Sequence, residues 1–256
     1  MTYQEVLEQA RTCMGKCRAC PVCNGLACKN TIPGPGAKGL GTGALRSYQK
    51  WQELCVNMDT ICENKPVDTT FTLFGRAVSL PVFAAPVGAM RLHYGDKYDD
   101  LTYNDILVRA CANAGILAFT GDGTDPKVVE GAAEALKANG GCGVPTIKPW
   151  DMDTIREKFA LVQESEPFAI AMDIDAAGLP FLQGLTPPAG SKSVEGVKQI
   201  GSWAQRPFIL KGIMTARGAE KALEAGASGI VVSNHGGRVL DHCPATAEGL
   251  PDIVDA

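Results

Sequence analysis

We expect an α/β fold in which helices cover a parallel sheet, because short apolar runs alternate with amphipathic helical stretches from residue 81 onward. A repeated strand–helix unit lays successive strands side by side in parallel, since each helix returns the chain to the edge where the previous strand began. The predicted strands are Val82–Pro86, Ile116–Gly121, Gly143–Lys148, Phe168–Asp175, Phe208–Ile213 and Gly229–Asn234. The predicted helices between them are Tyr103–Ala114, Pro126–Asn139, Asp151–Gln163, Ser193–Ala204 and Ala216–Ala225.

Polar residues gather at the carboxyl ends of these strands, whereas the strand interiors carry almost none. An open doubly wound sheet is the alternative, but no G-x-G-x-x-G motif opens a helix after any predicted strand. A TIM (β/α)8 barrel instead places its chemistry at the carboxyl ends of its strands. We therefore predict a TIM (β/α)8-type barrel with one active-site face. The residues gathered at the strand ends are Thr120, Lys148, Asp173, Asp175, Lys211, His235 and Arg238.

The predicted barrel is short of a full set of strands. Six predicted strands fall within residues 81–256, whereas a closed barrel of this type has eight. At roughly 30 residues per strand–helix unit, the span has room for about six units. We therefore expect the chain to lack the last two strand–helix units and to stop inside the sixth helix, which would leave the isolated chain poorly stable.

Residues 1–43 differ in composition from the rest of the chain and form a segment of their own. Thr2 and Glu5 make a capping-box pair that predicts a short first helix, and a cysteine-rich stretch and a glycine- and proline-rich loop follow it. Residues 44–256 form the barrel unit. The predicted elements between residue 44 and the sheet are a helix from Ala44 to about Ile61 and a hairpin of Thr69–Leu73 and Arg76–Leu80.

The composition is that of a soluble globular protein, with a formal net charge of -4 and 45% hydrophobic residues. This slight acidity gives no reason to expect nucleic acid as a partner. The longest apolar run, Leu80–Met90, is too short to span a bilayer, which needs roughly 20 apolar residues. The N-terminus lacks a basic start followed by an apolar core, so we expect no signal peptide and a cytoplasmic protein with reduced thiols.

The ten cysteines fall into one cluster of five and five scattered residues. A cluster this dense favours a metal site, and thiolates suit zinc or an iron–sulfur cluster. Loop cysteines without a ligand are the alternative. A radical-SAM triplet is disfavoured because it normally follows the first barrel strand, whereas here only a short helix precedes the cysteines. The cluster comprises Cys13, Cys17, Cys20, Cys23 and Cys28. The scattered residues, which we predict to be buried thiols, are Cys55, Cys62, Cys111, Cys142 and Cys243.

His235 ends an apolar strand and is followed by two glycines and Arg238. A neutral histidine can take up a proton near pH 7. Glycines let the backbone approach a ligand closely, and the planar guanidinium of Arg238 matches a carboxylate. A packed or surface histidine is the alternative. The combination favours a base beside a carboxylate-binding cation.

Lys211 ends the preceding apolar strand, at the level of His235. A fixed positive charge there suits an anionic cofactor atom, and a reduced flavin carries negative charge near N1. The alternative is a lysine that reaches out to solvent. Asp173 lies near the end of the strand before that, where it could orient His235 and stabilise its protonated form. A helix N-cap is the alternative for Asp173.

The run Ser233–Arg238, followed by Leu240 and Asp241, resembles the active-site signature of the FMN-dependent α-hydroxy-acid dehydrogenases and oxidases, the glycolate oxidase and lactate dehydrogenase type. Three further segments resemble parts of this family, and the resemblance runs from about residue 40 to residue 256. The segments are Phe208–Ile213, which is similar to the family's lysine strand, Val82–Gly88, which is similar to its first strand, and Asp68–Gly75, which is similar to the stretch before that strand.

The resemblance implies a TIM barrel, bound FMN and oxidation of a 2-hydroxy acid to a 2-oxo acid. It implies that His235 removes a proton from the substrate while hydride equivalents pass to flavin N5, and that Asp173 pairs with His235. Arg238 would hold the substrate carboxylate, and Lys211 would lie beside flavin N1 and O2. The implied flavin-binding residues are Ala85, Pro86, Val87, Thr120, Lys211, Ser233, His235 and Gly236.

The sequence departs from the family pattern on the substrate side. The third strand reads Val144–Lys148 where the family has a Gln-x-Tyr pair, and Ala171 stands where the family has threonine. The second carboxylate-binding arginine of the family is missing from Ala176–Pro180. We hypothesise that Lys148 supplies the missing charge and binds substrate with His235 and Arg238. The cysteines are a further departure; they could pass electrons to a carrier, which would favour a dehydrogenase over an oxidase.

Other functions stay open at this point. A related FMN barrel with non-redox chemistry, like type 2 isopentenyl diphosphate isomerase, is disfavoured because its substrate has a diphosphate and no carboxylate for Arg238. An inactive, truncated fragment is a further alternative, since the family's seventh and eighth strands bind the FMN phosphate, and we expect weak FMN binding for that reason. The expected partners are a small-molecule 2-hydroxy acid and an unidentified electron acceptor, and family members often form homo-oligomers.

Overall fold

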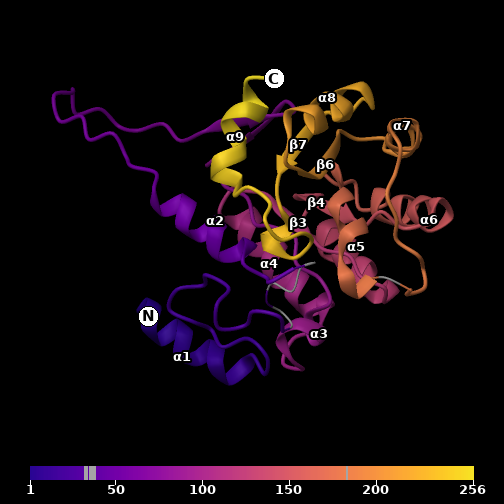
Figure 1. Ribbon diagram of the computed structural model, residues 1–256, viewed down its shortest axis with the longest axis horizontal. Coiled ribbons are helices and arrows are strands. Elements are labelled where there is room, and N and C mark those ends of the chain that lie inside the picture. The colour runs from indigo at the N-terminus through magenta and orange to yellow at the C-terminus, as the bar shows by residue number, and fades with distance from the viewer. Residues whose placement is uncertain (32–33, 35–38, 183) are drawn as a thin grey trace.

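The computed structural model describes residues 1–31, 34, 39–182 and 184–256, so part of the predicted glycine- and proline-rich loop lies outside the described residues. Its central sheet is parallel, with the strand order β3-β4-β5-β6-β7 (Figure 1). Chain order and sheet order therefore agree, as they do in a barrel wall. The strands are β3 (Ala118–Thr120), β4 (Gly143–Ile147), β5 (Ile170–Asp173), β6 (Phe208–Ile213) and β7 (Gly229–Val232).

The first predicted strand, Val82–Pro86, is reduced to a single bridge. Ala84 pairs in parallel with Ala118 at the open side of β3, where its N–H donates to the carbonyl of Leu117 and its carbonyl accepts from the N–H of Phe119. Prolines 81 and 86 bracket this stretch, and proline has no N–H for a strand ladder. The segment therefore lies where a first strand would lie but makes only one bridge to β3.

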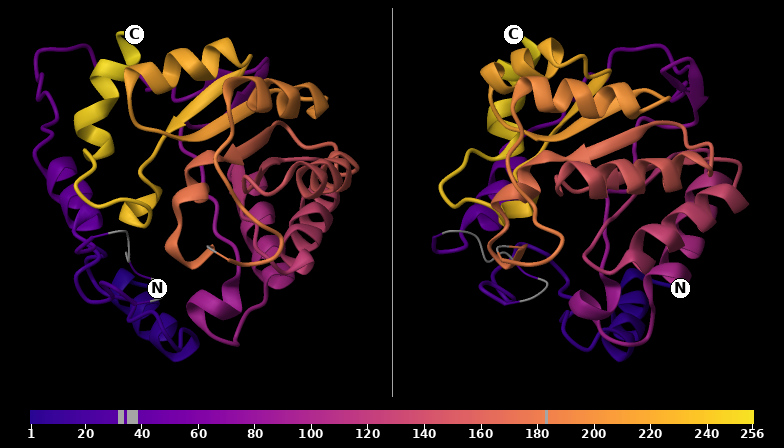
Figure 2. Two further views of the ribbon diagram at one scale, coloured as in Figure 1. Left: turned by 45° about the vertical axis from the view of Figure 1, so that its right-hand side comes forward. Right: turned by 90° about the vertical axis from the view of Figure 1, so that its right-hand side faces the viewer.

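Helices follow the strands along the outside of the curved sheet (Figure 2). The five predicted inter-strand helices are confirmed, and each begins at a side chain that accepts a backbone N–H, namely Asp99, Asp125, Asp151, Ser193 or Thr215. None of the helices in the described part of the chain is long and apolar enough to cross a membrane. The helices are α4 (Asp100–Asn113), α5 (Pro126–Ala138), α6 (Met152–Gln163), α7 (Val194–Trp203), α8 (Ala216–Glu224) and, after β7, α9 (Thr246–Val254).

The sheet is buried on both faces, and its strands alternate between two apolar clusters. On β5 and β6 the side chains of Ile170, Met172 and Leu210 join the large cluster under α6 and α7. Their neighbours Ala171 and Ile209 face a smaller cluster on the other, inner side of the sheet. Alternate residues of a strand point to opposite faces. The same alternation sends Asp173 and Lys211, each two residues further along its strand, inward as well.

The helix predicted from Ala44 to Ile61 is wrong in its second half. Helix α2 (Gly43–Gln52) ends at Gln52, and Met58 and Ile61 are 87% and 95% exposed in an extended stretch that reaches away from the sheet (Figure 1). An isolated helix of this length is marginal without an apolar surface to pack on, and no described element offers one there. The same stretch leaves Cys55 and Cys62 exposed, contrary to the prediction that they are buried.

The remaining elements outside the sheet match the sequence. Helix α1 (Tyr3–Cys13) has the predicted capping box between Thr2 and Glu5. The predicted hairpin forms from β1 (Phe71–Leu73) and β2 (Arg76–Val78), with a tight turn at Phe74 and Gly75. A short helix, α3 (Met90–Tyr94), follows the Ala84 bridge. Of the other scattered cysteines, Cys111 and Cys142 are buried as predicted, and Cys243 is half-buried.

Asp241 fastens the segment before α2 to the loop after β7. Its buried carboxylate accepts hydrogen bonds from the N–H of Leu40 at 2.7 Å, the N–H of Thr42 at 3.0 Å and the hydroxyl of Thr42 at 2.7 Å. The hydroxyl of Thr42, with these amides, lowers the pKa of Asp241 to about 2. Arg46 on α2 adds a bidentate pair with Glu248 on α9. These bonds join residues about 200 positions apart in the sequence.

We predict that Asp241→Ala lowers the free energy of unfolding by about 2–3 kcal/mol at pH 7, because it removes the charged acceptor of three partly buried hydrogen bonds. A folded-state pKa below the unfolded one gives stability that is present above about pH 4 and is lost as the pH falls toward 2. The deficit of the variant should therefore shrink over that range. Urea unfolding at several pH values measures it, with the exposed Asp252→Ala as a charge-matched control, and equal stability at pH 7 would contradict this role for Asp241.

Candidate active site

The inner face of the sheet carries charged side chains where β5 and β6 end. Asp173 and Lys211 are register partners on these strands. Each lies two residues after an inward-facing residue, Ala171 or Ile209, and so faces inward too. Lys148, one residue beyond β4, lies four residues after the inward-facing Val144, so the alternation of the strand directs it inward. Strand alternation alone therefore sends three charged groups into the interior at the carboxyl end of the sheet.

Asp173 pairs with two lysines. Its Oδ1 lies 2.6 Å from the Nζ of Lys211, and its Oδ2 lies 3.4 Å from the Nζ of Lys148. All three side chains are at least 87% buried, since their exposed fractions are 7%, 10% and 13%. Burial alone would raise the pKa of Asp173, but Lys148, His235 and Lys211 hold it well below its usual range. The carboxylate is therefore ionised at neutral pH.

His235 reaches this pair from a strained turn after β7. It opens the short 3-10 helix η3 (His235–Gly237) with φ +58°, a left-handed conformation that is unusual outside glycine. The side chain of Asn234 accepts the N–H of Gly237 and donates to the carbonyl of Pro244, and the hydroxyl of Ser233 accepts the N–H of His235. Residues held in such conformations are often functional, because the surrounding bonds must sustain the strain.

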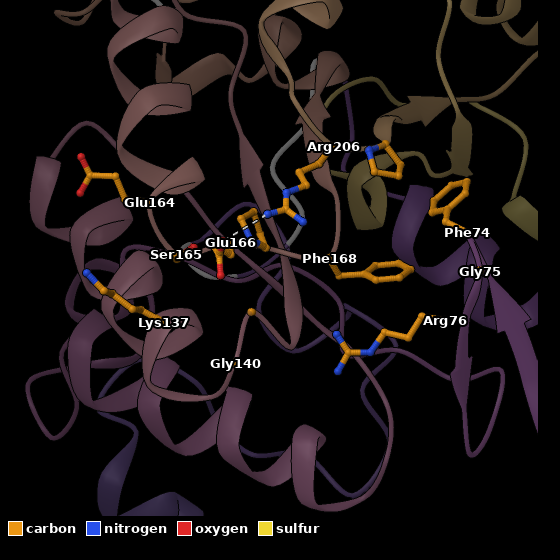
Figure 3. Close-up of a pocket in the computed structure, with 13 residues that line it drawn as sticks. Phe74, Gly75, Arg76, Lys137, Gly140, Glu164, Ser165, Glu166, Phe168 and Arg206 are labelled. Carbon is orange, nitrogen blue, oxygen red and sulfur yellow. Dashed lines mark ion pairs between the residues drawn. The ribbon is translucent and has the colours of Figure 1, made fainter.

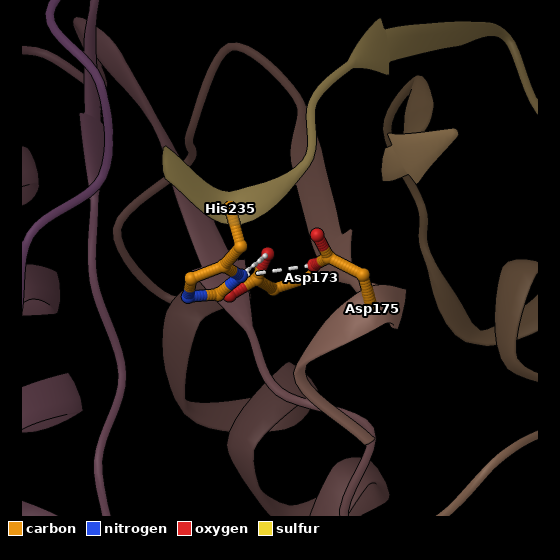
Figure 4. Close-up of side chains that lie close together, drawn as sticks. All are labelled: Asp173, Asp175 and His235. Carbon is orange, nitrogen blue, oxygen red and sulfur yellow. Dashed lines mark hydrogen bonds and ion pairs between the residues drawn. The ribbon is translucent and has the colours of Figure 1, made fainter. Parts of the chain in front are cut away.

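Two carboxylates meet the imidazole of His235 (Figure 4). Its Nδ1 lies 3.0 Å from Oδ1 of Asp175 and 3.4 Å from Oδ1 of Asp173. Asp175 belongs to the 3-10 helix η1 (Ile174–Gly178), which directly follows β5. Burial raises the pKa of Asp175, against the opposite effects of His235 and Lys211. Asp175 is one of the polar strand-end residues of the sequence, but the family resemblance assigns the pairing with His235 to Asp173.

Arg238 follows η3 and adds a third cation to this end of the sheet. Its Nη1 lies 3.4 Å from the carbonyl oxygen of His235. Its charge also reaches α3: burial lowers the pKa of His93, and the charges of Arg238 and Lys148 lower it further. The three cations, Lys148, Lys211 and Arg238, therefore come from β4, β6 and η3 to one region of the interior.

The predicted flavin-contacting residues Thr120 and Ala85–Val87 lie at or beside the carboxyl end of β3, but Thr120 follows the inward-facing Phe119 and so points to the helix side of the strand. Thr120, the last residue of β3, is fully buried, and its Oγ1 has no hydrogen-bond partner among the described residues. The segment Ala85–Val87 continues from the Ala84 bridge beside β3, and its Ala85 is exposed. A buried hydroxyl without a partner is costly unless a bound group pairs with it. Ser233 and Gly236 lie on the opposite side, around His235.

A second buried network, which the sequence did not reveal, supports Lys148. Asp122 accepts the N–H of Lys148 at 3.0 Å and the indole N–H of Trp150 at 2.6 Å, and it pairs with the Nζ of Lys158 on α6 at 2.5 Å. All the polar side chains in this network are buried. Asp122 thus fixes the backbone from which Lys148 projects. No motif marks such a network, because its members are 26 to 36 residues apart.

The grouping of Asp173, Asp175 and His235 has donor atoms within 4.8 Å of one another, as a metal site would. The ammonium groups of Lys211 and Lys148 already neutralise Asp173 there, and a metal ion beside them would meet their repulsion. We therefore interpret the grouping as a base with its acidic partners. Within the described part of the chain, the five clustered cysteines bring no three sulfurs within that distance.

The cysteine segment lies against this end of the protein. The Nζ of Lys16 donates to the carbonyl of Leu92 on α3, at 2.6 Å. Burial raises the pKa of the Cys28 thiol, the thiolates of Cys23 and Cys17 raise it further, and Arg238 lowers it. The Cys28 thiol therefore lies within electrostatic reach of Cys17, Cys23 and the guanidinium of Arg238.

A separate open cleft of about 640 Å³ lies at the opposite ends of the strands (Figure 3). It is lined by Arg76, Lys137, Phe168 and Arg206, and Arg206 pairs weakly with Glu166 at 3.9 Å. Phe168 and the neighbouring Pro207 precede β5 and β6, so the cleft opens where these strands begin. In a barrel that end serves stability rather than chemistry.

Comparison with known proteins places the chain in a family. A family model described as FMN-dependent dehydrogenase matches residues 35–180 and 184–256, and the chain belongs to that family. The match covers nearly all of the predicted barrel unit, residues 44–256, and begins within the N-terminal segment. The resemblance noted in the sequence is thereby confirmed.

Curated relatives align over the most similar stretches only. A peroxisomal (S)-2-hydroxy-acid oxidase of Oryza sativa subsp. indica is 47% identical over 72 residues, which are 28% of this chain and 19% of the relative. A 2-hydroxyacid oxidase of Dictyostelium discoideum is 54% identical over 57 residues, which are 22% of this chain and 15% of the relative. The alignments thus span about a fifth or less of the length of these relatives.

Solved structures confirm the fold class. A tyrosine-to-phenylalanine mutant of mandelate oxidase with (S)-mandelic acid superposes with a TM-score of 0.75 at 24% identity, over 99% of this chain and 75% of that one. A mutant flavocytochrome b2 with pyruvate bound gives 0.65 at 18% identity, over 81% and 55%. The parallel sheet described above is therefore part of a TIM-type barrel wall.

Proposed function

We propose that this protein is an FMN-dependent oxidoreductase that oxidises a 2-hydroxy acid to a 2-oxo acid. The observation that carries the proposal is the convergence of a carboxylate-bound histidine with Lys211 and Arg238 at the carboxyl end of the sheet, in a chain of the FMN-dependent dehydrogenase family. The relatives named as 2-hydroxy-acid oxidases and the structural neighbour that binds (S)-mandelic acid support the same substrate class.

The described residues fit FMN on the ring side. Lys211 would stand beside the electron-rich edge of the ring, and Ala85–Val87 would pack against the ring. Ser233 and Gly236 would approach from the His235 side. When bound, FMN supplies the acceptor for the two electrons that leave the substrate. The protein supplies the proton acceptor and the charges that orient the substrate.

His235 acts as the base. Its Nδ1 faces the carboxylates of Asp175 and Asp173, so Nε2 points away from them (Figure 4) and is available for the proton of the substrate hydroxyl. The two carboxylates then stabilise the imidazolium that forms, in the way an acid supports the histidine of a catalytic triad. The strained turn at His235 fixes the direction of approach.

The charges around the base favour an anionic substrate. With both carboxylates ionised, Lys148, Lys211 and Arg238 against Asp173 and Asp175 leave a local charge of +1 (3 − 2) before any substrate binds. A pocket of one sign attracts ligands of the other. We propose that Arg238 pairs with the substrate carboxylate and that Lys148 supplies the second cation, which the family takes from an arginine absent here.

We further propose that the cysteine cluster holds an iron–sulfur cluster. Zn–S bonds of about 2.3 Å in a tetrahedral site bring the sulfurs to roughly 3.8 Å from one another. An iron–sulfur cluster holds its thiolates further apart, because several metal atoms stand between them. In the described part of the chain no three of these sulfurs lie within 4.8 Å of one another, which favours the latter. The proximity of Cys28 to Arg238 supports a path for electrons from the flavin to a carrier, and hence a dehydrogenase.

Four of the five clustered cysteines are the proposed ligands. Cys17, Cys20 and Cys23 all raise the pKa of the Cys28 thiol, so each of the three acts electrostatically on Cys28. Cys13 ends α1, and its sulfur contacts the hydroxyl of Thr12 at 3.6 Å. We propose Cys13 as the fifth, dispensable thiol.

We propose the cytoplasm as the compartment and a homo-oligomer as the assembly. None of the ten cysteines forms a disulfide in the structure, which supports a reducing environment. The exposed apolar side chains of Val56, Met58 and Ile61 support self-association, because large apolar side chains on an extended segment favour a protein partner. Light scattering after size-exclusion chromatography tests the assembly, and a strictly monomeric chain would refute it.

For the oxidoreductase, we expect the anaerobically purified protein to show flavin absorption that bleaches when glycolate, lactate or mandelate is added. His235→Asn should retain the flavin bands but lower the rate of bleaching by about 10²–10⁴-fold, because it removes the base. Stopped-flow absorbance measures the rate, and His242→Asn, the same change at an exposed histidine outside the proposed contacts, is the control. Full flavin bands that no 2-hydroxy acid bleaches would refute the proposed reaction.

For the cysteines, we expect iron and acid-labile sulfide in anaerobically purified protein. Cys20→Ser should lose both, whereas Cys13→Ser, a matched thiol-to-hydroxyl change 7 residues away, should retain them. Elemental analysis and sulfide determination give the content. One equivalent of zinc without iron would refute the iron–sulfur assignment, and loss of iron in Cys13→Ser would refute the choice of ligands.

A further inference from the structure

Two carboxylates compete for the same nitrogen of His235, and the distances separate their tasks. Asp175 Oδ1 lies 3.0 Å from Nδ1 and makes a hydrogen bond with it, whereas Asp173 Oδ1 lies 3.4 Å away. Asp173 Oδ1 is instead 2.6 Å from the Nζ of Lys211, which is 3.9 Å from Asp175. The shortest contact of Asp173 is therefore with lysine, and that of Asp175 is with the histidine.

The charge of Asp173 is already compensated. Lys211 binds one of its oxygens and Lys148 approaches the other. Asp175 has no contact of that strength with a cation, and its Oδ2 is buried without a hydrogen-bond partner among the described residues. A carboxylate that is not held by a lysine interacts more strongly with an imidazolium, since its field is not cancelled by a neighbouring cation.

The backbone of β6 is shaped to make room for Asp175. Gly212 has φ +104°, and the pairing of β6 with β7 shifts register between Lys211 and Ile213. A Cβ at Gly212 would lie 2.4 Å from Cγ of Asp175 and 2.8 Å from its Oδ1. Both the dihedral angle and the contact exclude a side chain. This bulge lets the carboxylate of Asp175 lie against the strand and reach Nδ1.

We propose that Asp175, rather than Asp173, is the positioning residue that orients the imidazole of His235, while Asp173 serves chiefly to hold Lys211 and Lys148. An ionised carboxylate only accepts hydrogen bonds, so Asp175 requires the proton of the neutral imidazole to be on Nδ1 and leaves the lone pair of Nε2 for the substrate. The inference rests on the proposed function for its catalytic meaning, but the tautomer it requires is a property of the protein alone.

The test compares Asp175→Asn with Asp173→Asn, using nitrogen-15 NMR of protein labelled at histidine. The chain has three histidines, so His93→Gln and His242→Gln assign the signals of His235. An asparagine amide can donate to Nδ1, which favours the opposite tautomer. We expect Asp175→Asn to lose the Nδ1–H tautomer and to slow flavin reduction by roughly 10²–10⁴-fold with flavin content unchanged. Asp173→Asn should keep the tautomer and instead weaken flavin retention.

Gly212→Ala provides a second route to the same question, because its methyl group displaces Asp175 without removing any charge. It should also lose the Nδ1–H tautomer. Retention of that tautomer in both Asp175→Asn and Gly212→Ala, or its loss in Asp173→Asn alone, would overturn the proposal. A protein that shows the expected tautomers but oxidises no 2-hydroxy acid would instead refute the proposed function and leave the assignment of Asp175 intact.

Discussion

The buried ion pair between Asp173 and Lys211 is the interaction on which the rest of the candidate site depends. Its two members face inward at matching register positions of β5 and β6, only 7% and 10% exposed. Loss of one partner of such a pair leaves an uncompensated charge and typically costs about 3–5 kcal/mol. Lys148 and His235 are arranged around this pair, so a defect in it would disturb both the base and the cations.

The site combines a familiar base with an altered set of charges. In the proposed site, His235 is the base, Arg238 holds the substrate carboxylate and Lys211 stands beside the flavin. Lys148 is the cation proposed in place of the family's second arginine, and the buried Asp122 network holds its backbone in place. These differences lie around the substrate rather than around the base, so they bear on which acid is bound more than on the chemistry itself.

The N-terminal segment is attached to the barrel at the face that carries the chemistry. Lys16 bonds to α3, and Asp241 draws Leu40 and Thr42 onto the loop after β7, so both ends of the cysteine stretch are anchored near Arg238. Such tethering over long sequence separations confines the segment to one side of the sheet. A metal cluster held there would lie close to the proposed flavin, from which its electrons would come. A cluster on the outer surface formed by the helices would lie further from it.

The sequence by itself determined the periodic elements and the identity of the central groups. Apolar runs predicted the strands, amphipathic stretches predicted the helices α4 to α8, and the run around His235 predicted a base with its arginine. Only the tertiary structure decided that α2 ends at Gln52, that Asp122 supports Lys148 and that Asp175 lies nearer to His235 than Asp173 does. The reason is physical. Local patterns encode which face of an element is apolar, whereas hydrogen bonds between side chains 26 to 60 residues apart depend on how the strands meet.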